Sequence, residues 1–531
     1  MKKAHSVLVV LVLLLSTAFS GCTSQPTVAP SPQQDENRIA KMTFGAVATV
    51  ANTNINDAQY DRLIRVFCLQ GLTRIGPSGA LEQELAKSWQ VSPDLKKWTF
   101  QLFDNATWSD GKPVTSSDVK FTLENLARFT PHKMLYTEDI ESIETPDANT
   151  VIINLKKPDA NLLYTWDVVK MLPEHVYKGV QNISSFNGNE ASLGSGPYIF
   201  ENFDKNAGLL VFKANENYWE GKPPVDVIEY RMYKNTDTLI QAFLKGEIDA
   251  PASTINYYYV PKILQKEELG IMTAKNGGVS LAIYFNVEKP PYDSKVFREA
   301  MSYAIDYDEM MKLFTAGYGS IPPAGWIPEG LYGYVETRPL AYDVNKSKAL
   351  LDSMGMVDRD GDGFREMPDG TRFQGEITAR SDIADHTRAA EMLKKYFNAV
   401  GIDIKFKWVD LATFDALTGA TEEMILSSTS YFGISMGAGY GTGLVGTGEY
   451  GWCRLNETNY NSLADQLSMA GDEDTRLKLG GDLQGYYADN LPMITVYSMD
   501  LIQPYNKKYA GWVVGLSSVL NHHTIMELKP A

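Results

Sequence analysis

The sequence predicts an α/β protein built from two or three domains. Its 531 residues exceed the size at which a single hydrophobic core stops growing, so the chain is expected to divide. Three stretches, near residues 97–126, 279–317 and 376–410, each pass from a strand pattern to a helix pattern. This alternation is typical of α/β domains rather than of all-α or all-β ones.

The first stretch, KKWTFQLFDNATWSDGKPVTSSDVKFTLENLARF, predicts a strand, a turn at Asp110 and Gly111, and a helix. Thr115 and Asp118 have the spacing of a capping box, in which two side chains satisfy free backbone amides at a helix start. The apolar stripe of this helix consists of Val119, Leu123 and Leu126.

The second and third stretches follow the same logic. VSLAIYFNVEKPPYDSKVFREAMSYAIDYDEMMKLFTAG predicts a buried strand, a Pro-Pro connection and two helices, with Asp306 and Glu309 at the start of the second helix. EITARSDIADHTRAAEMLKKYFNAVGIDIKFKWVD predicts a strand, a long amphipathic helix and another strand. Between them, DVNKSKALLDSMG predicts a helix with Asp343 as its N-cap and Gly355 just past its end.

The N-terminus predicts export. Lys2 and Lys3 precede an apolar run from Val7 to Leu15, which is too short to span a bilayer comfortably and is typical of a secretory signal. FSGC resembles the lipoprotein box, so residues 1–21 are expected to be a signal peptide and Cys22 the lipidated mature N-terminus; the alternative is an ordinary cleaved signal. Residues 22–41, rich in Pro, Ser, Thr and Gln, predict a flexible tether.

Composition and charge limit the partners. The net charge is −16, from 49 basic and 65 acidic residues, which excludes binding to a phosphate backbone and therefore nucleic acid. Cys68 and Cys453 are available for a bridge in an exported protein, but spacing does not decide between a disulfide and two buried thiols. The absence of a CxxC motif argues against a thiolate zinc site.

No convincing catalytic set is present in the sequence. GISMG places Ser435 in a G-x-S-x-G pattern, yet the glycine-rich run that follows cannot form the helix that a nucleophile elbow needs. An exported serine hydrolase using Ser435 is therefore kept only as the rival class. His522 and His523 adjoin, and in a strand they would point to opposite faces, which favours structural or surface roles.

One acidic loop matches the spacing of an EF-hand. DRDGDGFREMPD has oxygen-bearing side chains at positions one, three, five, nine and twelve, and glycine at six. The segment after it predicts a strand instead of the second helix of an EF-hand, so a structural calcium loop and a plain acidic turn both remain open. The candidate ligands are Asp358, Asp360, Asp362, Phe364 through its backbone, Glu366 and Asp369.

Several longer stretches, taken in order, resemble one family. They include LAKSWQVSPDLKKWTFQLFDNATWSDGKPVTSSDVKFTLE, GSGPYIFENFD, NENYWEGKPPVDVIEYRMY, YFNVEKPPYDSKVFREAMSYAIDYDEM and YNSLADQLSMAGDEDTRLKLGGDLQGYYADNLPMITVYSMD. In these residues the chain resembles the extracytoplasmic solute-binding proteins of the peptide/nickel class of ABC importers, solute-binding family 5. The resemblance covers nearly the whole mature chain.

The resemblance implies a fold and a role. The fold is the type II periplasmic-binding-protein-like fold with three lobes, in which lobe I is discontinuous and the lobes close about a hinge. The expected limits are 42–75, 196–275 and 495–531 for lobe I, 76–195 for lobe II and 276–494 for lobe III. The role is that of a monomeric, non-catalytic subunit, lipid-anchored on the outer face of the membrane or periplasmic, that needs no cofactor and delivers a solute to an ABC permease.

The resemblance also suggests site residues. Arg380 lies close to the arginine that pairs with the solute carboxylate in dipeptide binders, although it could equally be a surface arginine at a strand end. Tyr431 and Phe432 fall near an aromatic position of the solute site, but the aspartate that holds the solute ammonium is missing before Glu449. His386, with Arg380 and Tyr431, could contact a nickel chelate; oligosaccharides are a third solute class. A peptide is the leading expectation.

Overall fold

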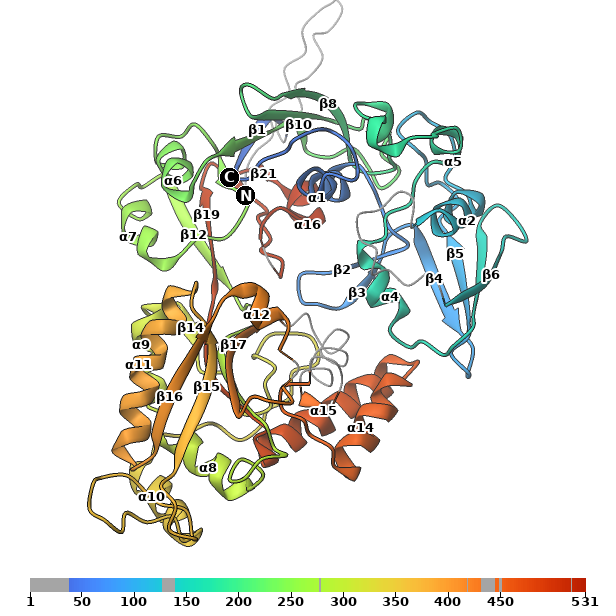
Figure 1. Ribbon diagram of the computed structural model, residues 1–531. Helices are drawn as coiled ribbons and strands as arrows, with labels where there is room; N and C mark the ends of the chain where they lie inside the picture. The colour runs from blue at the N-terminus through green and yellow to red at the C-terminus, as the bar shows by residue number, and fades with distance from the viewer. Residues whose placement is uncertain are drawn as a thin grey trace, which may run out of the picture. The chain divides into compact units, whose positions relative to one another are not determined.

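The computed structural model describes residues 38–126, 139–276, 278–417, 419–430, 445–447, 451–516 and 518–531. In these ranges the fold is mixed α/β and is organised around sheets of five, four and six strands (Figure 1). The predicted α/β class is confirmed. None of the helices in these ranges is both long enough and apolar enough to cross a membrane.

The five-stranded sheet draws its strands from distant parts of the chain. Its order is β11-β1-β10-β9-β8. Strand β1 is parallel to both of its neighbours, β10 and β11, whereas β9 is antiparallel to both of its neighbours, β10 and β8. The strands are β1 (Ile39–Val47), β8 (Tyr198–Asp204), β9 (Leu209–Ala214), β10 (Val225–Tyr233) and β11 (Ala250–Pro251). The longer helices of this region are α1 (Ala58–Phe67), α6 (Thr236–Leu244) and α16 (His522–Glu527). Apolar side chains of α1 and the strands, among them Phe44, Ile64 and Phe212, share one fully buried core.

Two glycines of the GSGP segment let the chain pass close to the end of α1. A Cβ on Gly194 would lie 1.8 Å from the carbonyl oxygen of Cys68, and one on Gly196 would lie 2.7 Å from the Cys68 carbonyl carbon. The amide of Gly196 donates to that carbonyl oxygen at 2.8 Å. Any larger residue would collide with backbone here, so the close approach requires glycine.

The four-stranded sheet is antiparallel, with the order β4-β5-β7-β6. Its strands are β4 (Ala86–Val91), β5 (Lys97–Leu102), β6 (Ile140–Glu144) and β7 (Thr150–Leu155). Helix α2 (Ser116–Glu124) follows the predicted turn, and the predicted capping box of Thr115 and Asp118 is present. Val119 and Leu123 are buried as predicted, in the core below the sheet.

The six-stranded sheet has the order β14-β18-β13-β17-β15-β16, in which β15 is parallel to β16 and β17 and the other pairs are antiparallel. Its strands are β13 (Gly278–Phe285), β14 (Gly319–Ser320), β15 (Gln374–Arg380), β16 (Asp403–Val409), β17 (Met424–Ser430) and β18 (Met493–Met499). The helices of this region are α8 (Lys295–Ala304), α9 (Tyr307–Thr315), α10 (Val344–Ser353), α11 (Ala384–Ala399), α12 (Leu411–Asp415), α14 (Thr458–Ser468) and α15 (Glu473–Asn490).

Both faces of this sheet are covered. Alternate residues of β13 enter different cores: Ile283 packs with α8, α9 and α11, whereas Tyr284 packs with α14 and α15. A strand covered on both faces reads as a continuous apolar run, which explains the sequence VSLAIYF. The helix starts also follow the prediction, because Asp306 and Asp343 each accept a backbone N–H in the first turn of their helices.

Two adjacent strands connect the regions of the five- and six-stranded sheets. β12 (Leu269–Ala274) leads into β13, and β18 leads through Asp500 into β19 (Leu501–Asn506). β12 and β19 pair antiparallel, side by side in Figure 1, and Lys275 Nζ lies 3.1 Å from Asp500 Oδ1. Paired crossings of this kind can absorb a rotation between two bodies, so we expect the hinge here.

The remaining elements are short. They are β2 (Thr73–Ile75), β3 (Leu81–Gln83), α4 (Leu162–Thr165), α5 (Glu174–Tyr177), α7 (Val260–Ile263), β20 (Tyr509–Ala510), β21 (Lys529–Pro530) and single 3₁₀ turns at Trp166–Val168, Ile183–Ser185, Glu190–Ser192 and Tyr257–Tyr259.

The two cysteines are separate buried thiols. Cys68 belongs to the core of the five-stranded sheet and Cys453 to a core beside the six-stranded sheet. The sequence left open whether Cys68 and Cys453 form a disulfide or two buried thiols, and the structure has two buried thiols.

Candidate functional site

A cavity of about 730 Å³ lies next to helix α1, at the carboxyl ends of β1 and β11. The carboxyl ends of parallel strands are where α/β sheets bind ligands, and the volume is within the range of about 300–1,000 Å³ that is usual for ligand pockets. The lining comes from β1, α1, β2, Glu84, Val168, Lys170, Pro197, Tyr230, the segment after β11 and the segment 518–522.

The cavity carries more positive than negative side chains. Arg62, Arg65, Arg74 and Lys170 line it, together with one carboxylate, Glu84. Lys170 Nζ lies 3.0 Å from Glu84 Oε2 and both side chains are largely buried. Glu84 Oε2 also accepts the backbone N–H of Gly71 at 2.5 Å, so this ion pair is fixed in place.

A polar network supports one side of the cavity. Gln70 donates to the hydroxyl of Tyr218 at 2.9 Å and accepts from the indole N–H of Trp219 at 2.8 Å. His522 Nε2 lies 3.4 Å from Glu220 Oε2. Burial alone would raise the pKa of Glu220, but hydrogen bonding to His522 and nearby positive charges outweigh burial and lower it.

The conditional strand interpretation of the adjacent histidines was wrong. His522 and His523 open helix α16, because Asn521 accepts the backbone N–H of Thr524 and caps the helix. The two imidazoles engage different carboxylates, Glu220 and Glu82. His522 also lines the cavity, so the predicted structural or surface role stays a prediction for it.

Arg380 lies at the carboxyl end of β15, opposite Val409 at the end of β16. Its guanidinium already forms a bidentate pair with Asp382, with Nε donating to Oδ1 at 2.9 Å and Nη2 to Oδ2 at 2.7 Å. Hydrogen bonding to Asp382 raises the pKa of Arg380, and the same bonds lower the pKa of Asp382. A solute carboxylate at Arg380 would therefore either replace Asp382 or share the guanidinium with it through Nη1.

His386 is buried in the first turn of α11. It is 3% exposed, and Nδ1 has no hydrogen-bond partner in the described part of the chain. Burial, and next the charge of Arg380, lower its pKa, so the imidazole is neutral near pH 7. The structure thus brings His386 and Arg380 to the same edge of the sheet.

Other residues that the sequence singled out lie outside the described residues; they are Tyr431, Phe432, Ser435 and Cys22.

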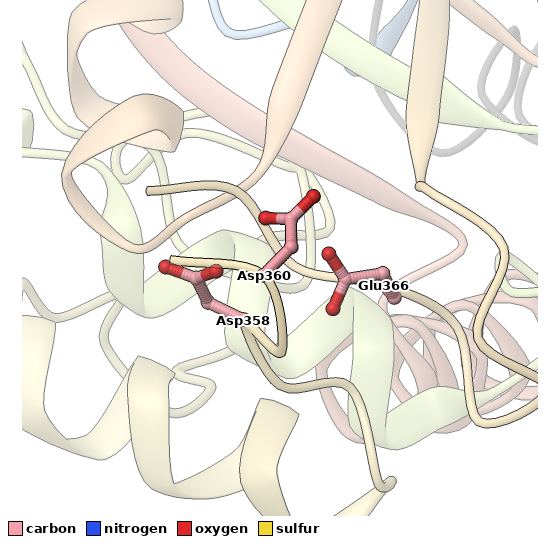
Figure 2. Close-up of side chains that lie close together, drawn as sticks. All are labelled: Asp358, Asp360 and Glu366. Carbon is pink, nitrogen blue, oxygen red and sulfur yellow. The ribbon is translucent and has the colours of Figure 1, made fainter. Parts of the chain in front are cut away.

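The acidic loop gathers three of its predicted ligands. Side-chain oxygens of Asp358, Asp360 and Glu366 lie within 4.8 Å of one another (Figure 2). Asp362 instead pairs with Arg372, and Asp369 accepts from Thr371 at 2.7 Å.

Hydrogen bonds inside the loop use the same carboxylates. Asp358 accepts the backbone N–H of Gly361 at 2.7 Å, and Glu366 accepts that of Arg359 at 2.7 Å. Phe364 donates its N–H to Asp362 at 2.8 Å. Calcium takes six to eight oxygen ligands, so three converging carboxylates fit it only in part.

The sequence interpretation did not identify the cavity residues. Arg62 and Arg65 are three apart on α1, a spacing that puts two cations near one face of a helix. That spacing is visible in AQYDRLIRVF, but nothing local indicates that Tyr230 and residues 518–522 meet this helix.

Comparison with known proteins places the chain in a family. Residues 80–449, more than half of the chain, match the family described as bacterial extracellular solute-binding proteins, family 5, middle region. The chain belongs to this family. The resemblance seen in the sequence is confirmed, and the fold of this family 5 protein is periplasmic-binding-protein-like.

Individual relatives agree with this assignment. A Brucella ovis protein named for ABC-transporter peptide binding is 28% identical over 347 residues, which are 63% of this chain and 61% of that one. The chain therefore spans less than two thirds of the length of that relative. The dipeptide-binding protein DppE of Bacillus subtilis is 24% identical over 552 residues, 95% of each chain.

A solved structure shows the same fold. NikZ from Campylobacter jejuni, crystallised in complex with Ni(L-His), superposes with a TM-score of 0.67 at 23% identity, covering 92% of this chain and 99% of NikZ.

Proposed function

We propose that this family 5 protein captures a short peptide outside the cytoplasm and delivers it to the permease of an ABC importer. The similarity to DppE, a dipeptide-binding protein, over 95% of both chains carries the proposal. The cavity beside α1 supports it, because its volume of about 730 Å³ and its mixed apolar and polar lining suit a small organic solute with a charged end.

The proposal includes the setting of the protein. A signal peptide ending before Cys22, lipidation of Cys22 and the tether 22–41 would hold a monomer at the outer face of the membrane, where it meets the permease. The chain would supply binding and no catalysis. Three lobes with the expected limits would close about the β12–β19 crossings.

A nickel chelate is the second candidate. NikZ was crystallised with Ni(L-His), and this chain offers a buried, neutral imidazole at His386 whose Nδ1 has no partner among the described residues. Neutral imidazole is a ligand that nickel accepts. An oligosaccharide is a third solute class, which no described contact favours over the other two.

Native mass spectrometry of the gently purified protein, followed by a thermal-shift screen, tests these candidates. The screen uses peptides, nickel with histidine, and oligosaccharides. We expect a co-purified peptide or a rise in Tm with peptides. A rise only with nickel and histidine, lost in His386→Leu, would transfer the proposal to metal-chelate uptake.

A labelling experiment tests the absence of catalysis. Ser435→Ala should leave solute affinity unchanged, and a fluorophosphonate probe should not label the protein. Covalent labelling at Ser435 would support the rival hypothesis of an exported hydrolase.

The acidic loop 358–369 is proposed to be a scaffold element. Its carboxylates are held by loop amides and by Arg372, so calcium is expected to add stability at most and not to affect solute choice.

A further inference from the structure

Two polar groups at the cavity beside α1 have no partner within the described ranges. Arg62 is exposed at the cavity and forms no ion pair or hydrogen bond with a described residue. Tyr230 is 6% exposed, and its hydroxyl has no hydrogen-bond partner among these residues either. This hydroxyl is not among the fully buried atoms that lack a partner, so it opens into the cavity, where water or a ligand can accept its hydrogen bond.

The other basic side chains of the cavity are already neutralised. Each faces a carboxylate of this chain, in the pairs Arg65–Asp61 at 3.0 Å, Arg74–Glu82 at 3.2 Å and Lys170–Glu84 at 3.0 Å. Arg62 is therefore left as the uncompensated charge of the described lining. Its single positive charge is balanced by a monoanion, whereas a phosphate dianion would leave an excess negative charge.

Both groups are hydrogen-bond donors. Burial raises the pKa of Tyr230 to about 12, against a smaller opposing effect of the Arg62 charge, so the phenol keeps its proton at neutral pH. Arg62 presents N–H donors in a planar fork and has no acceptor. A carboxylate, which is planar and accepts at two oxygens, is the group that complements this fork.

Apolar side chains form part of the cavity lining beside the polar ones. Val47, Leu63, Val66 and Leu520 line the same cavity. Apolar walls with a few convergent polar groups are typical of sites that orient an organic ligand by one charged end.

We infer that this cavity binds the carboxylate end of a solute with an apolar body, with Arg62 and Tyr230 as the donors. For the peptide proposed above, on which the inference rests, the bound end is an apolar C-terminus. Arg380, the carboxylate anchor suggested by the sequence, is already paired with Asp382, whereas Arg62 has no competing carboxylate among the described residues.

The experiment compares peptide acids with peptide amides. Isothermal titration uses an equimolar library of apolar tripeptides as free acids and the same library as C-terminal amides. The proteins are wild type, Arg62→Gln, Arg62→Lys and Tyr230→Phe. The control is Arg231→Gln, because Arg231 follows Tyr230 on β10 and does not line the cavity. Arg231 pairs with Glu229, and the substitution leaves Glu229 paired with Lys41 at 3.1 Å.

We expect wild type to bind acids at least about 10-fold more tightly than amides, because only the acids offer Arg62 a charged acceptor. Arg62→Gln should weaken acids roughly 10- to 100-fold and leave amides unchanged, and Arg62→Lys should restore part of the loss. Tyr230→Phe should weaken acids by a smaller factor, and Arg231→Gln should change neither.

The outcomes separate this inference from the proposed function. Equal binding of acids and amides by wild type, or equal losses for both in Arg62→Gln, would overturn the inference while peptide binding stands. No binding of either library by wild type, together with no peptide in the native mass spectrum and no shift in the peptide screen, would overturn the peptide function itself.

Discussion

Arg476 of α15 connects two parts of the fold that are far apart in sequence. It is 4% exposed, and its guanidinium donates to Asn161 Oδ1 at 2.7 Å, to the carbonyl of Ala160 at 2.6 Å and to the carbonyl of Ala470 at 2.7 Å. The guanidinium carbon also lies 5.2 Å from the ring centre of Tyr164. Arg476 thus joins the segment after β7 to the helices beside the six-stranded sheet.

Arg476→Met tests how much this connection stabilises the fold. Hydrogen bonds to a charged group contribute about 1.5–3 kcal/mol each, and the substitution removes three and leaves their acceptors without a donor. Burial lowers the pKa of Arg476, which shows that desolvating the charge offsets part of this gain. We expect a net loss of about 3–5 kcal/mol in the free energy of unfolding, because three neutral acceptors each lose a donor at a cost of about 1–3 kcal/mol.

Urea unfolding followed by fluorescence measures the loss, and hydrogen exchange should show faster exchange around residues 159–164. Lys478→Met is the control, because Lys478 is an exposed residue of the same helix that pairs with Asp482 at 2.9 Å, and surface changes usually stay within about 0.5 kcal/mol. A loss below about 1 kcal/mol for Arg476→Met would refute the reasoning, since the three hydrogen bonds would then contribute nothing net.

Three further predictions concern single features. Gly194→Ala should lower Tm strongly, because the new Cβ would lie 1.8 Å from the carbonyl oxygen of Cys68. Gly179→Ala is the control and should change Tm little, because its new Cβ would have no atom within 4 Å; equal effects of the two substitutions would contradict the close approach described for the GSGP segment. Burial raises the pKa of Cys68 and of Cys453 to about 12, so iodoacetamide at pH 8 should label neither in the native protein and both after unfolding; rapid native labelling would show that the thiols are accessible. EDTA should leave solute affinity unchanged, and an affinity that is lost in EDTA and restored by calcium would connect the loop 358–369 to the solute site.

Features that depend on neighbouring residues could be predicted from the sequence. The capping box of Thr115 and Asp118 and the cap at Asp306 depend on side chains three residues apart, so local spacing was sufficient. The continuous apolar run of β13 likewise predicted a buried strand, and the structure covers it on both faces.

Features that depend on residues far apart in the chain could not be predicted from the sequence. The acidic loop matched five ligand positions, but Arg372, which lies outside the motif, pairs with Asp362 and removes it from the cluster. The cavity is formed by segments as far apart as Ala46 and His522, which meet only because β1 and β11 pair and α16 packs near them. No periodicity in one segment reports such a meeting.

The two candidate carboxylate anchors differ in the acids beside them. Asp382 is two residues from Arg380 and reaches its fork, while on α1 the acidic Asp61 faces Arg65 one turn later and leaves Arg62 without an ion pair in the described structure. Asp382→Asn would therefore release Arg380. We expect this substitution to change affinity for apolar tripeptide acids by less than about twofold, because Arg62 holds the carboxylate. A gain of about tenfold or more, measured by the same titration and absent for the amides, would assign the carboxylate to Arg380 instead.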